Sequence, residues 1–496
     1  MWLTERAAIT YGEGGARINR LAHALRSLAW EGDRVALLTT NRFEGLEAHL
    51  AVNTAGMAAV PMNPKLHHRE YEYIIANADA GIVIFSNEFR AQITQIRPSL
   101  AGVHHWICIG DTADGFTPYE SLLAEGDTTP PEVRTGPDDL AWLFYTSGTT
   151  GQPKGAMETH RNLLTMIQQF LIGVVPGAGE DDVMLHAAPI CHGSGTCMLP
   201  FLAVGAAQAF LPKFDALSFL QCVARYRVTA TFLAPTMVDR IVNCDELSSF
   251  DTSSLTSLIY GGGPMHGALL KRAMEALGPV FVQIYGQGEA PFTISAMSRQ
   301  DHVLNSQAAL AHRLGSAGRV MTGTRVEILD DDGKAVQRGE KGEICVKGDL
   351  VMPGYWRNAQ ATADTLAGGW LHTGDVGYLD EDDYLYISDR KKDFIISGGS
   401  NIYSREVEEV ITRHPLVAAA AVIGVPDAEW GESVKAFVVR QPGAVVDGAD
   451  IIAFCKDNMA SYKKPKFVEF IDELPRNATG KVLKRELRLR RESATD

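Results

Sequence analysis

Residues 145–155 carry the side chains and glycines that a phosphate-binding loop needs. This segment reads YTSGTTGQPKG and follows the apolar, strand-like residues 140–144. Its glycines permit positive φ and a close backbone approach, while Lys154 supplies one positive charge. The other contributors are Thr146, Ser147, Gly148, Thr149, Thr150 and Gly151. The spacing differs from G-x-x-x-x-G-K-[ST] and from G-x-G-x-x-G. The sequence therefore predicts a phosphate loop of another kind, and a flexible surface loop is the alternative.

Three charged residues outside this loop have the chemistry of a nucleotide site. Asp375 and Arg390 each follow a strand-like stretch. A carboxylate suits the vicinal hydroxyls of a ribose, and a guanidinium offers several fixed donors, although either residue alone is more simply one half of a surface ion pair. Glu289 lies beside glycines, where a carboxylate could hold Mg²⁺ against a triphosphate.

These segments, in their order along the chain, resemble the motifs of the adenylate-forming superfamily. That superfamily contains acyl-CoA synthetases, the adenylation domains of peptide synthetases and firefly luciferases. The matching segments are residues 145–155, 260–264 (YGGGP), 285–289 (YGQGE), 370–375 (WLHTGD), 389–390 (DR), 398–402 (GGSNI) and 475–481 (PRNATGK). The resemblance extends over almost the whole chain. It implies an AMP-dependent acyl- or aryl-CoA synthetase that uses ATP, Mg²⁺ and coenzyme A (CoA).

The resemblance assigns the residues that hold ATP and AMP. The phosphate loop with Thr146 and Lys154 would hold the phosphates, and Asp375 and Arg390 the ribose. Glu289 and Thr146 would hold Mg²⁺, with Glu289, Lys154 and Lys481 as catalytic residues. The remaining nucleotide contacts implied are Gly261, Gly262, Gly263, Tyr285, Gly286 and Gln287.

Lys481 would by itself be one surface lysine among many, and only the resemblance singles it out. A cation there could bridge the substrate carboxylate and the α-phosphate during adenylation. The family then rotates its C-terminal domain about a linker residue, which here is Lys392. Rotation would withdraw Lys481 and bring Gly398, Gly399 and Ser400 to the CoA thiol, which attacks the acyl carbon as AMP leaves.

His192 matches a family histidine beside the acyl pocket, although a lone histidine is more often structural. With Met237 and Gly286 it is an expected substrate-binding residue. The expected pocket segments contain no Arg or Lys that could bind a second carboxylate, which favours a monocarboxylic aryl or medium-chain acyl acid. Fatty acid or aromatic acid metabolism would be the setting.

Three positions depart from the family pattern. Gly288 stands where a threonine is expected, which removes a hydroxyl from the α-phosphate unless a neighbour such as Gln287 compensates. Cys191 stands where an aromatic residue often precedes the histidine and could enlarge the pocket. Ser404 replaces a proline, with an effect expected mainly on backbone rigidity.

The elements that must position these residues read as α/β. Strand-like runs at residues 34–38 and 80–85 alternate with helix-period stretches such as 19–28, which is typical of parallel sheets. We expect an N-terminal ATP- and acyl-binding domain over residues 1–389 and a small mobile α+β domain over residues 390–496. In the latter, Ser404 is expected to cap a helix, followed by strands at 417–425 and 433–439, a helix from about 449 and a strand at 467–471.

Composition limits the function classes further. The net charge of −14 argues against a general nucleic-acid binder, which needs a basic surface. Seven cysteines without C-x-x-C spacing indicate neither a disulfide framework nor a zinc site. The sequence has no secretory signal or apolar run of membrane-span length, so a soluble cytoplasmic enzyme is expected. Homodimers are common in the family, but the sequence does not fix the oligomeric state.

Two alternatives stay open at this point. The chain could be a stand-alone adenylating enzyme that loads a carrier protein or oxidises its acyl group as luciferase does. Because it ends fifteen residues after Lys481, it leaves no room for a fused carrier domain, which favours free CoA. It could also be a nucleotide-binding regulator without turnover, as Gly288 suggests, but the charged residues assigned above argue against this.

Overall fold

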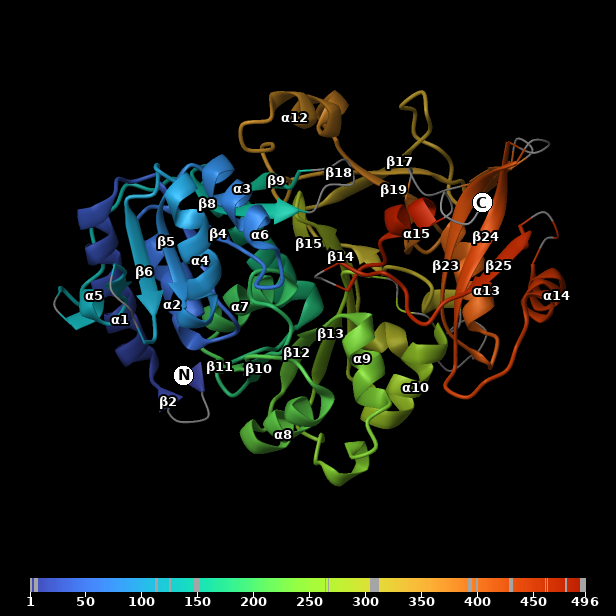
Figure 1. Cartoon of the computed structure of the whole chain (residues 1–496), viewed down its shortest axis with the longest axis horizontal. Coiled ribbons are helices and arrows are strands. Elements are labelled where there is room, and N and C mark those ends of the chain that lie inside the picture. Colours follow the sequence, from blue (N-terminus) through green and yellow to red (C-terminus); the bar gives the residue numbers. More distant parts are fainter. Residues whose placement is uncertain are drawn as a thin grey trace.

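The strands of the described residues form four β-sheets in a computed structural model of the chain. The structure describes residues 2–3, 8–111, 115–124, 126–146, 152–263, 265, 267–303, 312–390, 395–397, 400–427, 431–459, 461, 463–477 and 480–490. Figure 1 shows the N-terminal elements at the left, the middle of the chain below and the C-terminal elements at the right.

The first sheet has seven strands in the order β7-β6-β5-β3-β4-β8-β9 and is parallel except for the β8–β9 hairpin. Val35 and Leu37 of β3 pack with the helices on one face, and Ala36 and Leu38 with those on the other. Both faces are covered, which is why these strands are apolar throughout. The elements are β3 (Arg34–Leu38), β4 (Ala58–Pro61), β5 (Ala80–Ser86), β6 (His105–Ile109), β7 (Thr117–Pro118), β8 (Leu140–Thr146), β9 (Lys154–Thr159), α1 (Tyr11–Leu28), α2 (Phe43–Thr54), α3 (His68–Ala78), α4 (Arg90–Ile96) and α5 (Ser121–Ala124).

The second sheet has nine strands in the order β16-β15-β14-β13-β12-β10-β11-β1-β2. Strand β1, from the start of the chain, lies between β11 and the edge strand β2; it runs parallel to β11, with Trp2 opposite Gln208. The elements are β1 (Trp2–Leu3), β2 (Ala8–Ile9), β10 (Val183–His186), β11 (Ala207–Phe210), β12 (Ala230–Leu233), β13 (Ser257–Tyr260), β14 (Phe281–Gln287), β15 (Ala290–Met297), β16 (Arg319–Val320), α6 (His160–Gln169), α7 (Gly193–Ala203), α8 (Ala216–Tyr226), α9 (Pro235–Val242) and α10 (Gly267–Leu277).

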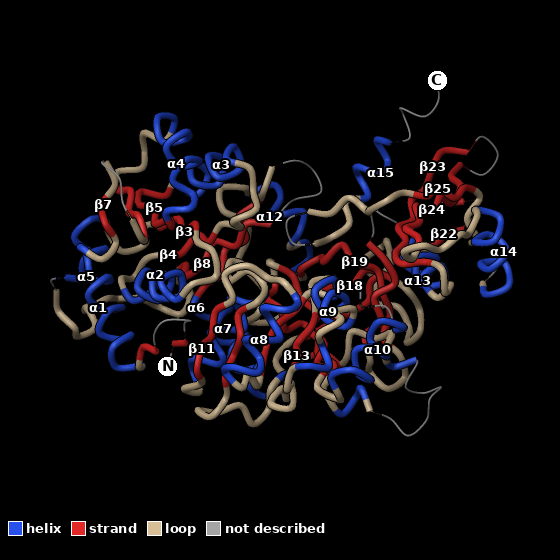
Figure 2. Tube along the Cα trace, turned by 60° about the horizontal axis from the view of Figure 1, so that its bottom comes forward, coloured by secondary structure: helices blue, strands red, loops and turns tan. Residues whose placement is uncertain are grey.

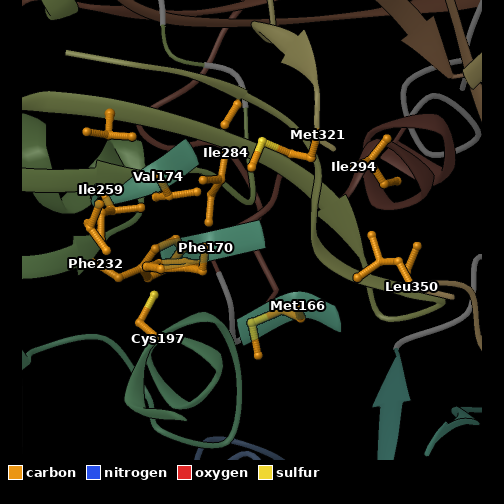
Figure 3. Packing of buried hydrophobic residues seen from close by; sticks show 14 of the residues in the cluster. Met166, Phe170, Val174, Cys197, Phe232, Ile259, Ile284, Ile294, Met321 and Leu350 are labelled. Carbon is orange, nitrogen blue, oxygen red and sulfur yellow. The ribbon is translucent and has the colours of Figure 1, made fainter. Parts of the chain in front are cut away.

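A third, antiparallel sheet of four strands follows in the order β17-β18-β19-β20. Its strands are β17 (Arg325–Leu329), β18 (Gly342–Lys347), β19 (Leu371–Leu379) and β20 (Leu385–Arg390), with α12 (Ala359–Thr365) between β18 and β19. The largest hydrophobic cluster joins this sheet to the nine-stranded sheet and to α6 and α7, and it includes Met166, Phe170, Phe232, Ile284 and Leu350 (Figure 3). The expected α/β architecture of the large N-terminal part is confirmed.

The last sheet combines β21, β22, β23, β24 and β25 with three helices. Figure 2 shows β23, β24 and β25 together at one end of the molecule, with α13 and α14 beside them. The bounds are β21 (Ile395–Ser397), β22 (Ser400–Ile402), β23 (Val417–Asp427), β24 (Gly431–Arg440), β25 (Phe467–Phe470), α13 (Ser404–Thr412), α14 (Gly448–Asn458) and α15 (Lys484–Arg490). This smaller α+β part agrees with the expectation from sequence.

Ser404 does not cap α13 as predicted. Tyr403 is the N-cap residue and makes no side-chain capping bond, while Ser404 is the first helical residue. The Ser404 hydroxyl instead donates to Asp389 Oδ2 at 2.7 Å, at the end of β20. A tertiary partner therefore uses the hydroxyl that local sequence assigned to the helix terminus.

Two further expectations concern the whole chain. All seven cysteines are free thiols, as their spacing indicated. Among the described helices, none combines the length and the hydropathy that crossing a bilayer requires. The expected hinge, Lys392, lies outside the described residues, so the division at residues 389 and 390 stays a prediction.

Candidate active site

A carboxylate corner forms where β14 approaches the four-stranded sheet. Asp375 and Arg390 are register partners on β19 and β20, and Arg390 Nε lies 3.2 Å from Asp375 Oδ1. From β14, the Tyr285 hydroxyl donates to Asp375 Oδ2 at 2.7 Å and Gln287 Nε2 donates to the same oxygen at 2.8 Å. Burial, and then the Asp375 charge, hold the pKa of Tyr285 well above its usual value, so the phenol keeps its proton.

The loop that presents Asp375 is itself fixed. The Thr373 hydroxyl donates to the Ile344 carbonyl at 2.7 Å and accepts from the Asp375 backbone N–H at 3.1 Å. Gln287 Nε2 also donates to the Thr373 carbonyl at 3.0 Å. The Gln287 amide nitrogen is therefore engaged at this corner.

Glycines after β13 and within β14 let neighbouring backbone segments pack closely. A Cβ on Gly261 would lie 2.7 Å from the Ile284 carbonyl oxygen, and a Cβ on Gly286 would lie 2.4 Å from Phe292 Cα. Gly262 has a φ of 75°, which other residues rarely adopt. A Cβ on Gly262 or Gly263 would meet no atom within 4 Å, so these two glycines leave open space that suits a planar ligand such as a purine.

A second polar group lies at the start of the β8–β9 hairpin. The Tyr355 hydroxyl donates to Glu289 Oε1 at 2.6 Å, and Lys154 Nζ lies 5.0 Å from the centre of the Tyr355 ring. Thr146 is the register partner of Lys154. The carboxylate and hydroxyl oxygens offered by Glu289 and Thr146 are ligands that Mg²⁺ prefers, so these residues fit the expected ion.

Gly288 is explained by two neighbours from β8. A Cβ on Gly288 would lie 2.6 Å from Phe144 Cδ1 and 2.7 Å from Thr146 Cγ2, closer than packing tolerates. The Phe144 ring therefore occupies space that a larger residue at position 288 would need. The absence of a threonine there follows from how this chain packs its phosphate-loop strand.

His192 lies among aromatic rings. The Phe144 ring centre is 5.3 Å from that of His192, and the Phe292 ring centre is 6.3 Å from those of Phe144 and Phe232. His192 Nδ1 is 2.7 Å from the Cys191 carbonyl, so that nitrogen carries the proton and donates. Burial lowers the pKa of His192, which favours a neutral ring whose Nε2 accepts a hydrogen bond.

The segment with Lys481 rests on the large domain. A Cβ on Gly480 would lie 3.3 Å from Thr236 Oγ1, at the start of α9 and next to Met237. The Lys481 backbone N–H donates to Asn477 Oδ1 at 2.8 Å, and the Arg476 guanidinium bonds the Gly480 carbonyl at 2.8 Å. The two hydrogen bonds fix the local turn that carries Lys481, and Gly480 places this turn close to the start of α9.

The comparisons with known proteins agree with this geometry. The family model described as AMP-binding enzyme matches residues 2–356, and the model of the AMP-binding enzyme C-terminal domain matches residues 406–481. The chain belongs to the AMP-binding enzyme family. Its members include the adenylate-forming enzymes that the sequence motifs resemble, so that resemblance is confirmed.

Individual relatives of this AMP-binding enzyme cover nearly its whole length. It is 39% identical to a feruloyl-CoA synthase of Amycolatopsis sp. over 97% of this chain and 94% of that protein. It is 34% identical to a medium/long-chain fatty acid–CoA ligase of Mycobacterium tuberculosis, over 97% and 86% of the two chains. The solved structure of an amide bond synthetase from Marinactinospora thermotolerans matches with a TM-score of 0.90 and 32% identity, over 98% and 96%. The enzyme is therefore an AMP-forming carboxylate–CoA ligase.

Four of the expected site residues in this enzyme, Tyr285, Gln287, Asp375 and Arg390, lie in contact, and some neighbours were missed. Tyr355, Thr373 and Phe144 were not anticipated; of these, only Thr373 and Phe144 adjoin recognised motifs in the sequence. Of the expected residues, Ser147, Gly148, Thr149, Thr150, Gly151, Lys392, Gly398 and Gly399 lie outside the described residues, and of Ser400 only the backbone is described.

Proposed function

We propose that this enzyme adenylates a monocarboxylic aromatic acid with MgATP and transfers the aryl-containing acyl group to CoA. The observation that carries the substrate class is the set of rings around His192, which is apolar and suited to stacking. The feruloyl-CoA synthase among its relatives supports the same class. A medium-chain acyl acid is the competing substrate that the experiment below must separate.

The nucleotide would occupy the surface between the Asp375 corner and the phosphate loop. Asp375 and Arg390 would bind the ribose hydroxyls, and the glycine backbone at 261–263 and 286 would lie against adenine. Glu289 and Thr146 would hold Mg²⁺, which supplies charge neutralisation for the pyrophosphate leaving group. Lys154, close to the Tyr355 ring, would contact the β- and γ-phosphates.

Lys481 would complete the adenylation site. The substrate carboxylate and the α-phosphate are both anionic, so their approach is opposed by repulsion that one ammonium group between them would offset. The closeness of Gly480 to Thr236 supports this role, because α9 also carries Met237, an expected substrate-binding residue. His192, accepting through Nε2, would orient a hydroxyl or amide donor of the acid or of the pantetheine arm.

The second step would use a different placement of residues 390–496. Rotation about Lys392 would remove Lys481 and bring the 398–400 turn to the thiol entrance, where glycines leave room for the pantetheine arm. The CoA thiol then attacks the acyl carbon, the thioester forms and AMP leaves. The hinge and this turn are carried over from the family motifs alone.

Compartment and assembly follow as secondary proposals. Seven free thiols suit a reducing cytoplasm, where ATP and CoA are available. Light scattering during size-exclusion chromatography would test the homodimer that the family resemblance allows.

The test measures AMP, pyrophosphate and thioester with ATP and Mg²⁺, across hydroxycinnamates, benzoates and C6 to C16 fatty acids, with and without CoA. The expected result is CoA-dependent AMP release and thioester formation with a substituted aromatic acid. Preference for a saturated C6 to C12 acid would reject the aromatic class but keep the ligase. Pyrophosphate release without any thioester would reject CoA as acceptor.

A variant separates the two steps. Lys481→Ala should abolish pyrophosphate release, while a synthetic acyl-adenylate given with CoA should still yield thioester. Lys466→Ala is the matched control, because that lysine pairs with Asp427 at 2.6 Å within the C-terminal domain and should leave both steps intact. Equal loss of both steps in Lys481→Ala would contradict the assigned role.

A further inference from the structure

A carboxylate, a thiol and an imidazole meet on the four-stranded sheet, outside the nucleotide corner. Glu343 and Cys345 stand two residues apart on β18, and His372 on β19 is the register partner of Cys345. His372 Nδ1 lies 3.1 Å from Glu343 Oε2 and 3.5 Å from Cys345 Sγ. The three potential ligand atoms all lie within 4.8 Å of one another. The proposed reaction uses none of these side chains.

We propose that Glu343, Cys345 and His372 bind one divalent transition-metal ion of the zinc type. A tetrahedral zinc with bonds of about 2.0 Å to nitrogen and oxygen and about 2.3 Å to sulfur separates its ligand atoms by about 3.3 to 3.6 Å. The nitrogen–oxygen and nitrogen–sulfur separations here are close to those values. The ion would take the place of the protons that the ring nitrogen and the thiol hold, with little side-chain movement.

The ligand set selects the metal class. One thiolate and one imidazole favour zinc and its neighbours over Mg²⁺, which takes oxygen ligands in an octahedron. Cys345 is fully buried, whereas the side chains of Glu343 and His372 are 11% and 25% exposed. An ion can therefore enter from the histidine side, where a water molecule would supply the fourth ligand.

The surrounding backbone supports a fixed ligand geometry. The Gly374 backbone N–H donates to Glu343 Oε1 at 3.2 Å, the oxygen that does not face His372. This bond would orient the ligating carboxylate, as hydrogen bonds around metal ligands commonly do. His372 also stands three positions before Asp375 in the chain, so a bound ion would stiffen the segment that presents the carboxylate corner.

The test uses the full-length enzyme after dialysis against a chelator, with Co²⁺ as a spectroscopic substitute for zinc. The expected result is a thiolate-to-cobalt absorption band that saturates at one equivalent and is displaced by Zn²⁺. Cys345→Ser should lose the band, and His372→Gln should weaken binding about 10-fold or more. Cys244→Ser is the matched control, because that thiol also lies near a carboxylate, Glu246 Oε2 at 3.2 Å, and should leave the band unchanged.

Two outcomes would overturn the proposal. Absence of the band in the unaltered enzyme at one equivalent would show an ordinary hydrogen-bonded cluster, and a band lost in Cys244→Ser but kept in Cys345→Ser would place the metal elsewhere. If Cys345→Ser does not fold, the His372→Gln variant decides the matter, because His372 is partly exposed.

A rise in melting temperature with Zn²⁺, but not with the same concentration of Mg²⁺, is the second expected result. Neither readout depends on the identity of the acid substrate.

Discussion

Two buried carboxylic acids of this enzyme have opposite surroundings. Asp375 receives hydrogen bonds from Tyr285 and Gln287 and pairs with Arg390. Glu158, in β9, is 2% exposed, and neither of its oxygens has a hydrogen-bond partner among the described residues. Burial, and then repulsion from Glu289, raise the pKa of Glu158 well above its usual value. Asp375 therefore has polar partners for both of its carboxylate oxygens, whereas burial of Glu158 favours its protonated form.

Two other buried side chains near Glu158 also have a polar atom without a hydrogen-bond partner among the described residues. Its register partner Trp142 has an indole N–H without a hydrogen-bond partner in the described part of the chain. Nε2 of His49 also has no partner there, and the His49 ring centre lies 4.7 Å from that of Trp142. Burial lowers the pKa of His49 to about 4, so this ring is neutral too. The difference teaches that the candidate nucleotide site gives its buried acid hydrogen-bond partners, while the interior beside the β8–β9 hairpin contains a buried acid without any among the described residues.

Asp375→Ala should have the largest effect. Removing one member of a buried, hydrogen-bonded charge pair costs about 2 to 5 kcal/mol, or roughly 30-fold to several thousand-fold in kcat/KM for ATP. Pyrophosphate release measures the loss. Asp382→Ala, whose side chain is 71% exposed, is the control and should change kcat/KM little. A loss of kcat/KM below threefold in Asp375→Ala would show that the carboxylate corner is not part of the nucleotide site.

Gly288→Thr tests the packing between the aromatic rings around His192 and the phosphate loop, because Gly288 lies against Phe144 and Thr146. Overpacking by the new side chain should cost about 1 to 3 kcal/mol of stability and lower kcat with it. Adding Phe144→Ala should recover part of that loss in the double variant. Thermal unfolding and initial rates of all four proteins give the coupling free energy. Additive effects of the two substitutions would contradict the steric pairing.

Glu158→Met should stabilise the protein by about 1 to 2 kcal/mol near neutral pH, because it removes a buried polar group without partners. The raised pKa makes the native protein lose stability as pH rises from about 4.3, the value in the unfolded chain, toward the folded value. The stability gain of Glu158→Met should therefore grow between pH 5 and pH 8, as denaturant unfolding would measure. Glu158→Gln, equally polar but without titration, is the control for burial alone. A gain that does not vary with pH would mean that Glu158 has a partner in solution.

Tyr355→Phe should have the smallest effect. It removes the hydroxyl that donates to Glu289 but keeps the ring near Lys154. A net loss of about 1 kcal/mol, or roughly fivefold, is expected in the Mg²⁺ concentration that gives half-maximal rate. Tyr378→Phe, whose ring stacks on Tyr386 away from Glu289, should leave that concentration unchanged. An unchanged Mg²⁺ dependence in Tyr355→Phe would contradict the proposal that Glu289 binds the metal ion.

The resemblance to family motifs was enough to assign Asp375, Arg390 and Tyr285 to one nucleotide site. Asp375, Arg390 and Tyr285 each stand in a segment with a recognisable pattern, and strand register then brings them together. The α/β alternation also followed from apolar runs such as β3, because both faces of a parallel strand are buried. Features fixed by short-range chemistry were therefore predictable.

Long-range contacts explain what the sequence did not reveal. Neither the hydrophobic periodicity nor the spacing of the motifs shows that Phe144 fills the space beside Gly288. They also do not show that Tyr355 donates to Glu289, which is 66 positions away in the sequence. Glu158 stands in a strand with the burial pattern of two buried residues after each partly buried one, so its own burial follows no period-2 alternation. Ser404 was misassigned because Asp389, a partner from another strand, competes for its hydroxyl.

The position of β1 has a consequence for how the chain is made. This strand joins the nine-stranded sheet by pairing Trp2 with Gln208, so it cannot be placed there until about two hundred further residues have been synthesised. At roughly 5 to 20 residues per second, that is a wait of about 10 to 40 seconds on the ribosome. During this time β1 can pair only with β2, and the side that faces β11 in the folded sheet is open to nascent-chain chaperones.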